Sequence, residues 1–130
     1  MAFLESIPPP NDATERSTDH AAPRILSLTL AHGADTAPSA QENLRALARH
    51  CTGGKRPLLM DLRMATDQTE GARLCYRHTL AHFVGPVAIL VGANVSRFLG
   101  EFLAGALRPR HLTRLFVNEE RARVWLVENA

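Results

Sequence analysis

Short apolar segments alternate with longer segments of helical periodicity along residues 24–130, and this alternation restricts the fold more than any other feature. The apolar segments read RILSLTL (24–30), PLLMDL (57–62), VAILV (87–91) and LTRLFV (112–117). Strands that alternate with helices form a mostly parallel sheet with helices packed on it. The sequence therefore predicts a single α/β domain with a mostly parallel or mixed sheet of about four to five strands and about four helices.

The apolar segments differ in the burial that they predict. In RILSLTL, Ser27 and Thr29 alternate with apolar residues, which is typical of a half-buried strand. PLLMDL is continuously apolar up to Asp61, and VAILV is apolar throughout. Unbroken apolar runs of this length predict central strands that are covered on both faces.

Glycines, proline and capping residues set the limits of the first two helices. The first should begin near Thr36 or at Ser39, where SAQE has the Ser-x-x-Glu form of a capping box, and should end at the glycines of residues 52–55. The second should cover residues 68–83, with the Gly-Pro pair at 85–86 as its stop signal.

The third and fourth helices are predicted from apolar spacing and from an N-cap. The last helix should begin after Asn118 and be anchored to the core by Trp125 and Leu126. In the third helix the apolar residues recur at i, i+3, i+4 and i+7. These residues are Val95, Phe98, Leu99, Phe102, Leu103, Ala106 and Leu107.

The N-terminal residues 1–23 form a separate segment in this interpretation, and residues 24–130 form the domain. Three prolines at 8–10 precede a polar stretch that cannot bury enough apolar surface to pack, so residues 8–23 are predicted to be a linker. The preceding MAFLESI is apolar enough to form an edge strand, either on its own domain or on a neighbouring subunit.

Charge and cysteine usage narrow the function classes. The 130 residues carry a net charge of +2, and acidic residues are interleaved with the arginines, which does not favour a nucleic-acid surface. No apolar run reaches the ~20 residues of a membrane span, and the start does not resemble a secretory signal. Cys51 and Cys75 have neither zinc-site nor disulfide-framework spacing. We therefore expect a cytoplasmic protein with no membrane span.

The segment at 61–71 is the first candidate site. Asp61 ends an apolar strand, and the carboxyl ends of strands are where functional groups gather in open α/β sheets. Thr66, Asp67 and Thr69 are candidate N-caps for the helix that follows. The start of that helix carries a positive dipole and free N–H groups, so it favours negative charge.

The stretch LLMDLRMATDQTEG (58–71) resembles the STAS domain of bacterial anti-sigma-factor antagonists. TGGKRPLLMDLR, AILVGANVSRFLGEF and TRLFVNEERARVWL resemble, more narrowly, uncharacterised small bacterial STAS-like proteins. In STAS antagonists a partner kinase phosphorylates a Ser or Thr just before the glycine that opens this helix. Here Glu70 precedes Gly71 and Thr69 stands one position earlier. Three alternatives stay open: Glu70 supplies a built-in charge, Thr69 takes the phosphate, or Thr66 or Thr69 only caps the helix.

Two further residue sets are weaker candidates. Asn94, Ser96 and Arg97 follow a buried strand and open a helix, where backbone N–H groups could hold an anion. Cys75, His78 and His82 share one helical face and include zinc-ligand types, but no fourth ligand is evident. Packing or solvation of these side chains is the simpler interpretation for both sets.

We therefore expect a non-enzymatic, STAS-like protein-interaction module with no cofactor. Its partner would be a protein, such as a regulatory kinase or anti-sigma factor, that docks on the 66–71 loop, the second helix and the exposed face of the third. The alternative is a small-ligand or anion-binding domain that uses the helix starts near Thr66 and Ser96. A homodimer is also expected, either through Phe98 and Phe102 or through the N-terminal segment.

Overall fold

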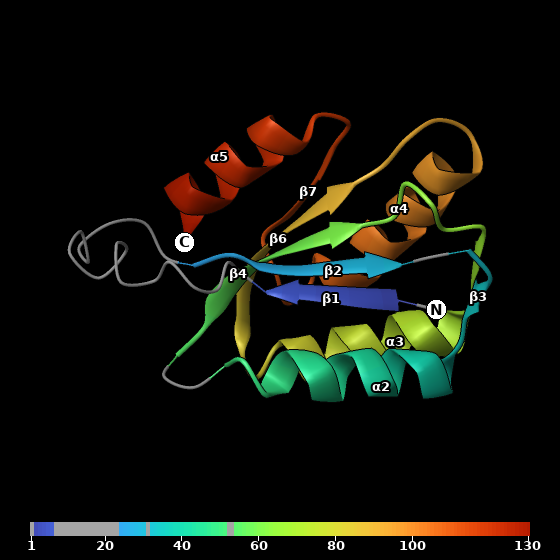
Figure 1. Ribbon diagram of the computed structural model, residues 1–130, viewed down its shortest axis with the longest axis horizontal. Helices are drawn as coiled ribbons and strands as arrows, with labels where there is room; N and C mark the ends of the chain where they lie inside the picture. Colours follow the sequence, from blue (N-terminus) through green and yellow to red (C-terminus); the bar gives the residue numbers. More distant parts are fainter. Residues whose placement is uncertain (1, 7–23, 31, 52–53) are drawn as a thin grey trace.

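The computed structural model describes residues 2–6, 24–30, 32–51 and 54–130. Its centre is a five-stranded sheet in the order β1-β2-β4-β6-β7 (Figure 1). The strands are β1 (Ala2–Ser6), β2 (Leu26–Leu30), β4 (Arg56–Asp61), β6 (Val84–Leu90) and β7 (Thr113–Phe116). Strands β2, β4, β6 and β7 pair in parallel, and β1 pairs antiparallel with β2. The predicted α/β fold with a mixed sheet is confirmed.

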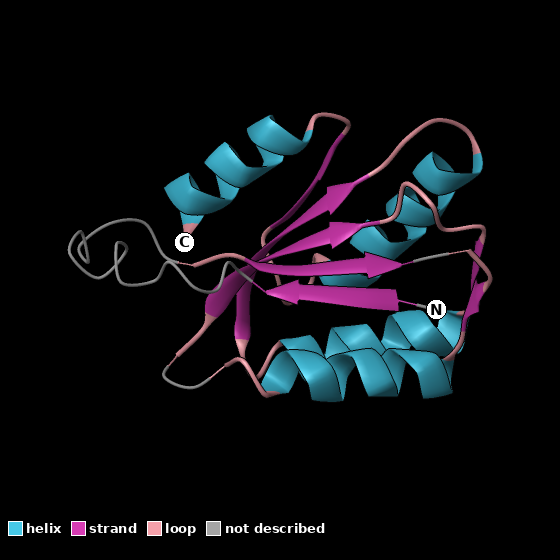
Figure 2. Ribbon diagram, in the orientation of Figure 1, coloured by secondary structure: helices cyan, strands magenta, loops and turns pink. Residues whose placement is uncertain are grey.

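Helices cover both faces of this sheet, as Figure 2 shows. They are α2 (Ala37–Ala48), α3 (Glu70–Leu80), α4 (Val95–Leu107) and α5 (Glu119–Asn129). Buried residues of α2, α3 and α4 share one core with the sheet, whereas Ala122 and Leu126 of α5 share a second, smaller one. Three described helices therefore cover one face and α5 covers the other. None of the described helices has the length and apolar character that a membrane crossing requires.

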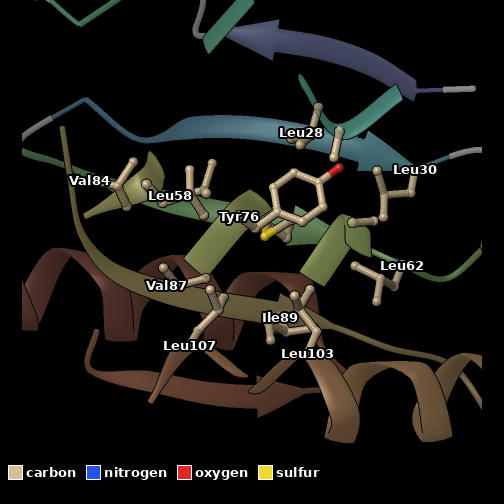
Figure 3. Close-up of a cluster of buried hydrophobic side chains, with 14 of the residues drawn as sticks. Leu28, Leu30, Leu58, Leu62, Tyr76, Val84, Val87, Ile89, Leu103 and Leu107 are labelled. Carbon is tan, nitrogen blue, oxygen red and sulfur yellow. The ribbon is translucent and has the colours of Figure 1, made fainter. Parts of the chain in front are cut away.

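Side-chain alternation along the strands distributes the core between the two faces. On β4, Leu58 and Met60 belong to the three-helix core, and Leu59 between them belongs to the α5 core. Figure 3 shows the larger core, in which the ring of Tyr76 lies among leucines of the sheet. Tyr76 has no solvent exposure, so its hydroxyl requires a partner inside the protein.

A two-stranded parallel ribbon, absent from the sequence prediction, lies at the carboxyl edge of the main sheet. It consists of β3 (Ala34–Asp35) and β5 (Asp67–Gln68), in the register Ala34↔Asp67 and Asp35↔Gln68. The ribbon therefore joins the segment before α2 to the segment before α3. Its strands have two residues each, which is too short for periodicity to reveal.

The Gly-Pro pair at 85–86 does not stop a helix as predicted. Helix α3 ends at Leu80, and the pair lies within β6. Proline donates no hydrogen bond to a strand ladder, and the β4–β6 register shifts between Arg56 and Leu58, opposite this pair. The irregularity in the ladder accommodates the proline.

The predicted half-buried strand is also wrong in its burial. Ser27 is only 6% exposed, and β2, an interior strand between β1 and β4, is buried nearly throughout. At the first helix, Thr36 is the N-cap and Ser39 is the third helical residue. The hydroxyl of Ser39 accepts from the Thr36 N–H at 2.8 Å. The predicted start near Thr36 is therefore confirmed, and the alternative start at Ser39, with its Ser39–Glu42 capping box, is not formed.

The apolar residues of α4 do not all enter the core. The helix buries Ser96, Leu99, Gly100, Leu103, Ala104 and Leu107, whereas Val95, Phe98 and Phe102 are more than half exposed. Gly100 permits this arrangement, since a Cβ there would come within 2.5 Å of Val91 Cγ1. The helix rests on the sheet through its small residues and presents its phenylalanines outward.

The first strand bears out the edge-strand prediction, because β1 pairs with β2 of its own chain. The predicted linker at residues 8–23 lies outside the described residues. At the other end of the chain, Asn118 caps α5 by accepting from the Arg121 N–H at 2.9 Å, as predicted. Leu126 is fully buried, and the Trp125 ring packs against Phe116 with centroids 5.5 Å apart.

Candidate functional site

Asp61 lies at the carboxyl end of β4, as the sequence predicted. Its Oδ1 accepts from the Arg63 N–H at 3.0 Å, and its Oδ2 pairs with Arg63 Nη2 at 2.8 Å. The hydrogen bond to Asp61 is the main cause of a raised pKa of the Arg63 guanidinium. Arg63 also reaches Glu119 of α5 at 3.4 Å. Asp61 therefore orders the start of the loop and connects it to α5.

Thr66 connects two loops and does not cap a helix. Its Oγ1 accepts from the Gly33 N–H at 3.0 Å, and Gly33 has a φ of 107°, in the region that favours glycine. Asp67 accepts from the adjacent Gln68 N–H at 2.9 Å. Both residues therefore stabilise the β3–β5 ribbon, and the prediction of an N-cap at Thr66 or Asp67 is wrong.

Thr69 is the N-cap of α3. Its Oγ1 accepts from the Ala72 N–H at 3.1 Å, and its own N–H donates to the Asp35 carbonyl at 2.9 Å. Glu70 follows in the first turn with its side chain exposed, where the helix dipole favours a carboxylate. A Cβ on Gly71 would meet Ala37 Cβ at 3.5 Å, an ordinary contact, which places the starts of α2 and α3 side by side.

A buried polar network lies beneath these helix starts, and the sequence analysis missed it. Asp35, which is only 6% exposed, accepts from Ser39 Oγ at 2.7 Å, Tyr76 Oη at 2.9 Å and Gln68 Nε2 at 3.0 Å. Asn43 Nδ2 donates to the Tyr76 hydroxyl at 3.0 Å. Burial, assisted by the nearby Asp35 charge, raises the pKa of Tyr76 above its ordinary range, so the hydroxyl stays a donor.

One sequence signal could have indicated part of this network. Tyr76 belongs to the buried face of α3, and a buried tyrosine needs a partner for its hydroxyl. No periodicity indicates Asp35, because it lies in a segment that looks like a simple turn. The network fixes β3, β5, α2 and α3 relative to one another, since its members come from all four elements.

Arg73 connects the start of α3 to α4. Its Nη1 donates to the Gln68 carbonyl at 3.0 Å, and its guanidinium carbon lies 5.3 Å from the centroid of the Phe102 ring. Phe102 stacks on Phe98 with centroids 6.2 Å apart, and these two rings are 58% and 67% exposed. Among the described residues no carboxylate forms an ion pair with Arg73.

Four exposed side chains and the half-buried Arg73 between them form one surface feature, which we call the α3–α4 surface: Glu70, Arg73, Val95, Phe98 and Phe102. It joins the predicted 66–71 loop to the outward face of α4 through Arg73. A cluster of exposed aromatic residues next to a cation is typical of an interaction surface. The chemistry that the arrangement supports is apolar contact with one charge-assisted hydrogen bond.

The three residues of the predicted anion site do not converge. Ser96 is buried, and its hydroxyl accepts from the Gly92 N–H at 3.1 Å and donates to the Leu62 carbonyl at 2.8 Å. Asn94 is the N-cap of α4 with a φ of 56° and makes no capping hydrogen bond. Arg97 points to solvent, 3.9 Å from Glu101. Ser96 holds the β6–α4 loop on the end of β4 rather than facing a ligand.

The predicted metal candidates are also separate. Cys75 is half-buried beside the Ala37 carbonyl, His78 is exposed on α3, and His82 is exposed beyond the end of that helix. Within the part of the chain that the structure describes, no three His, Cys, Asp or Glu side chains are grouped as metal ligands would be.

Comparison with known proteins identifies the fold. A solved structure of an uncharacterised DUF3478 family protein with a SpoIIAA-like fold, from Shewanella loihica PV-4, superimposes with a TM-score of 0.62. The match is 15% identical and covers 96% of this chain and 93% of the other, so it shows the fold alone. The STAS-like fold expected from the sequence is confirmed. No curated protein matches.

A family model matches almost the whole of the α/β domain. Its description is "Domain of unknown function (DUF7793)", and it spans residues 24–129, which include β2 to β7 and all four described helices. The chain therefore belongs to the DUF7793 family and has a STAS-like fold.

Proposed function

We propose that this protein is a non-enzymatic interaction module that docks a protein partner on the α3–α4 surface. The observation that carries the proposal is that Arg73 connects the hydrogen-bonded start of α3 to the exposed Phe98–Phe102 stack. Arg73 donates to the Gln68 carbonyl and lies over the Phe102 ring. Large apolar side chains exposed as a cluster are costly to leave in water, so they favour a partner. The STAS-like fold is consistent with such a role.

The chemistry of the surface describes the partner. Phe98 and Phe102 would contact apolar side chains, and Arg73 offers a guanidinium whose present contacts are a carbonyl and a ring face. A partner that presents an apolar patch with one carboxylate would use both features, because arginine pairs with carboxylates in a charge-assisted, bidentate way. Regulation would then follow from competition for this surface.

A phosphate switch at Thr69 would act on the same surface. The Thr69 hydroxyl caps α3, and a phosphate on it would add three terminal acceptor oxygens and roughly −1.5 to −2 charges next to Glu70. The added charge would change the partner preference of the surface. The anion-binding alternative near Thr66 and Ser96 receives less support, because both hydroxyls are engaged in bonds to backbone groups.

Site-specific photocrosslinking in the native host tests the proposal. A photoreactive phenylalanine analogue is placed at Phe98 or at Phe102, with a control at the exposed Val127 on the opposite face. We expect one protein to be crosslinked from both test positions but not from the control. The crosslink should be lost in a chain that also carries Arg73→Glu, whose far-UV spectrum should be unchanged.

Three outcomes would contradict the proposal. The same product from Val127 would show that capture does not depend on the surface. Products that contain only two copies of this chain would assign the surface to self-association. Crosslinking that persists with Arg73→Glu would show that the partner does not use the guanidinium of Arg73.

A further inference from the structure

The last strand of the sheet, β7, presents an open edge. Within the described residues β6 is the only strand that pairs with β7, and β7 ends the strand order. The carbonyls of Leu112 and Phe116 accept from β6-side N–H groups of Val87 and Val91. Successive peptide groups of a strand point in opposite directions, so those of Thr113, Leu115 and Val117 face away from the sheet. Unpaired edges of this kind accept another strand.

A groove of about 420 Å³ runs beside the same edge, between β7 and α5. Phe116, Val124 and Trp125 form its apolar part, and Arg114 lies over the Phe116 ring at 5.2 Å. The rim combines two arginines with two glutamates: Arg114, Arg121, Glu120 and Glu128. The charges of this rim sum to zero. If the rim of a second copy of this chain lay against it, each arginine would have a glutamate to pair with, and each glutamate an arginine.

The two flanking helices leave the edge accessible. The buried face of α5 rests on Leu59, Ala88 and Leu90, which belong to β4 and β6, so its axis lies inward from β7. On the opposite face α4 packs closely through Gly100, where a Cβ would lie 3.4 Å from Leu115 Cδ2. Val117, at the end of the strand, is 68% exposed. Among the described residues, no backbone hydrogen bond engages the outward N–H and C=O groups of Thr113, Leu115 and Val117.

The sequence of the edge is suited to antiparallel pairing with itself. A two-fold axis at Leu115 would place Thr113 opposite the partner's Val117 and Arg114 opposite the partner's Phe116. This register pairs all three outward peptide groups, whereas an axis at Arg114 or Phe116 pairs only two. It also keeps the guanidinium groups apart, because Arg114 faces a phenyl ring instead of a second arginine, and like charges directly opposite are destabilising.

We propose that two copies of this chain associate through β7, with antiparallel edge pairing centred on Leu115 and with the β7–α5 grooves joined across the two-fold axis. The occupant is a second copy because the rim and the strand are both self-complementary, as a two-fold interface requires. The inference is independent of the α3–α4 surface, which lies on other elements. The edge pairing would join the two sheets into one continuous sheet, and neither copy would keep an open β7 edge.

Sedimentation velocity of the full chain over a concentration series tests this dimer. The variant Arg114→Glu with Arg121→Glu makes the whole rim acidic, and both side chains are exposed. We expect the dimer Kd to rise by roughly 100-fold, because like-charge juxtaposition across an interface costs several kcal/mol. The matched control, Arg45→Glu with Arg49→Glu, makes the same charge change at exposed sites on and just after α2 and should leave Kd unchanged.

A rescue experiment sharpens the test. The variant Glu120→Arg with Glu128→Arg should also be monomeric, and an equimolar mixture of the two rim variants should form heterodimers. A wild-type chain that is monomeric at about 100 μM protein would overturn the proposal and leave the edge to another polypeptide. A dimer that survives the acidic rim, or a mixture that stays monomeric although both variants keep the wild-type far-UV spectrum, would also overturn it.

Discussion

The two loops that lead into α3 and α4 begin at neighbouring strands but are held in different ways. The β4–α3 loop runs through the β3–β5 ribbon, and its helix begins with a Thr69 cap above the buried Asp35 network. The β6–α4 loop has no ribbon, and Asn94 at its helix start has a φ of 56° and no capping bond. The buried hydroxyl of Ser96 holds this loop.

This difference separates two parts of the proposed docking surface. The α3 side is polar, extensively hydrogen-bonded and positioned by four elements, whereas the α4 side depends on close packing of small residues under exposed rings. Arg73 connects the two sides. We infer that the α3 side supplies fixed geometry and the α4 side supplies apolar area.

The largest expected effect comes from removing the centre of the α3 network. Asp35→Ala leaves the donors of Ser39, Gln68 and Tyr76 without their acceptor in a buried site, and we expect the free energy of unfolding to fall by about 3 kcal/mol. Urea unfolding measures this change. The control Asp67→Ala lies in the same ribbon but is exposed, so it should cost less than about 1 kcal/mol. Equal losses in both variants would refute the role of the network.

The α4 side should be most sensitive to added volume. In Gly100→Ala the new methyl group would lie 2.5 Å from Val91 Cγ1, so we expect a loss of about 1–3 kcal/mol in unfolding free energy. Gly105→Ala on the same helix faces open space and should stabilise the protein by about 0.5–1 kcal/mol. Thermal unfolding of the two variants compares them directly. A stabilising Gly100→Ala would show that α4 is not closely seated.

The two helix caps should respond differently to substitution. Thr69→Ala removes the oxygen that accepts from the Ala72 N–H, and we expect a loss of about 1 kcal/mol. Asn94→Gly should change the unfolding free energy by less than about 0.5 kcal/mol, because Asn94 makes no capping bond and its φ of 56° suits glycine. Denaturant midpoints distinguish these outcomes. A larger loss from Asn94→Gly would reverse the comparison.

The smallest effect concerns pH and the far end of α4. His111 is buried, its Nδ1–H donates to the Gly85 carbonyl at 3.0 Å, and burial lowers the pKa of this histidine. The unfolded state therefore binds a proton first as the pH falls below about 6.5, so stability should decrease from there down to the folded-state pKa. Urea unfolding at pH 7.5 and 5.5 should show this decrease, and His111→Gln should reduce it. If the unfolding free energy of the variant fell by as much between pH 7.5 and 5.5 as that of the wild type, groups other than His111 would cause the acid sensitivity.

The sequence predicted the layered fold because burial repeats regularly along strands and helices. The runs at 57–62 and 87–91 had no polar interruption before Asp61, and the structure places both in the middle of the sheet. The Asn118 cap could also be predicted, since its hydrogen bond joins residues only three positions apart in the sequence. Local and periodic signals were sufficient for these elements.

Tertiary contacts decided what the sequence did not reveal. Asp35 looks like a turn residue, and only its pairing with Gln68 and Tyr76, far along the chain, makes it the centre of a network. The apolar spacing of α4 did not distinguish Phe98 and Phe102 from Leu99 and Leu103, because a wide stripe does not specify which edge faces the sheet. The small residues Gly100 and Ala104 determined that rotation by allowing close approach.

Hydrogen exchange of this chain with and without the partner recovered by crosslinking tests the central claim most directly. The account predicts that amides in residues 66–74 and in residues 95–103 gain protection together on binding, while those of α2 stay unchanged. Protection confined to one of these two segments, or located at α2 or β7, would contradict a docking surface that spans α3 and α4.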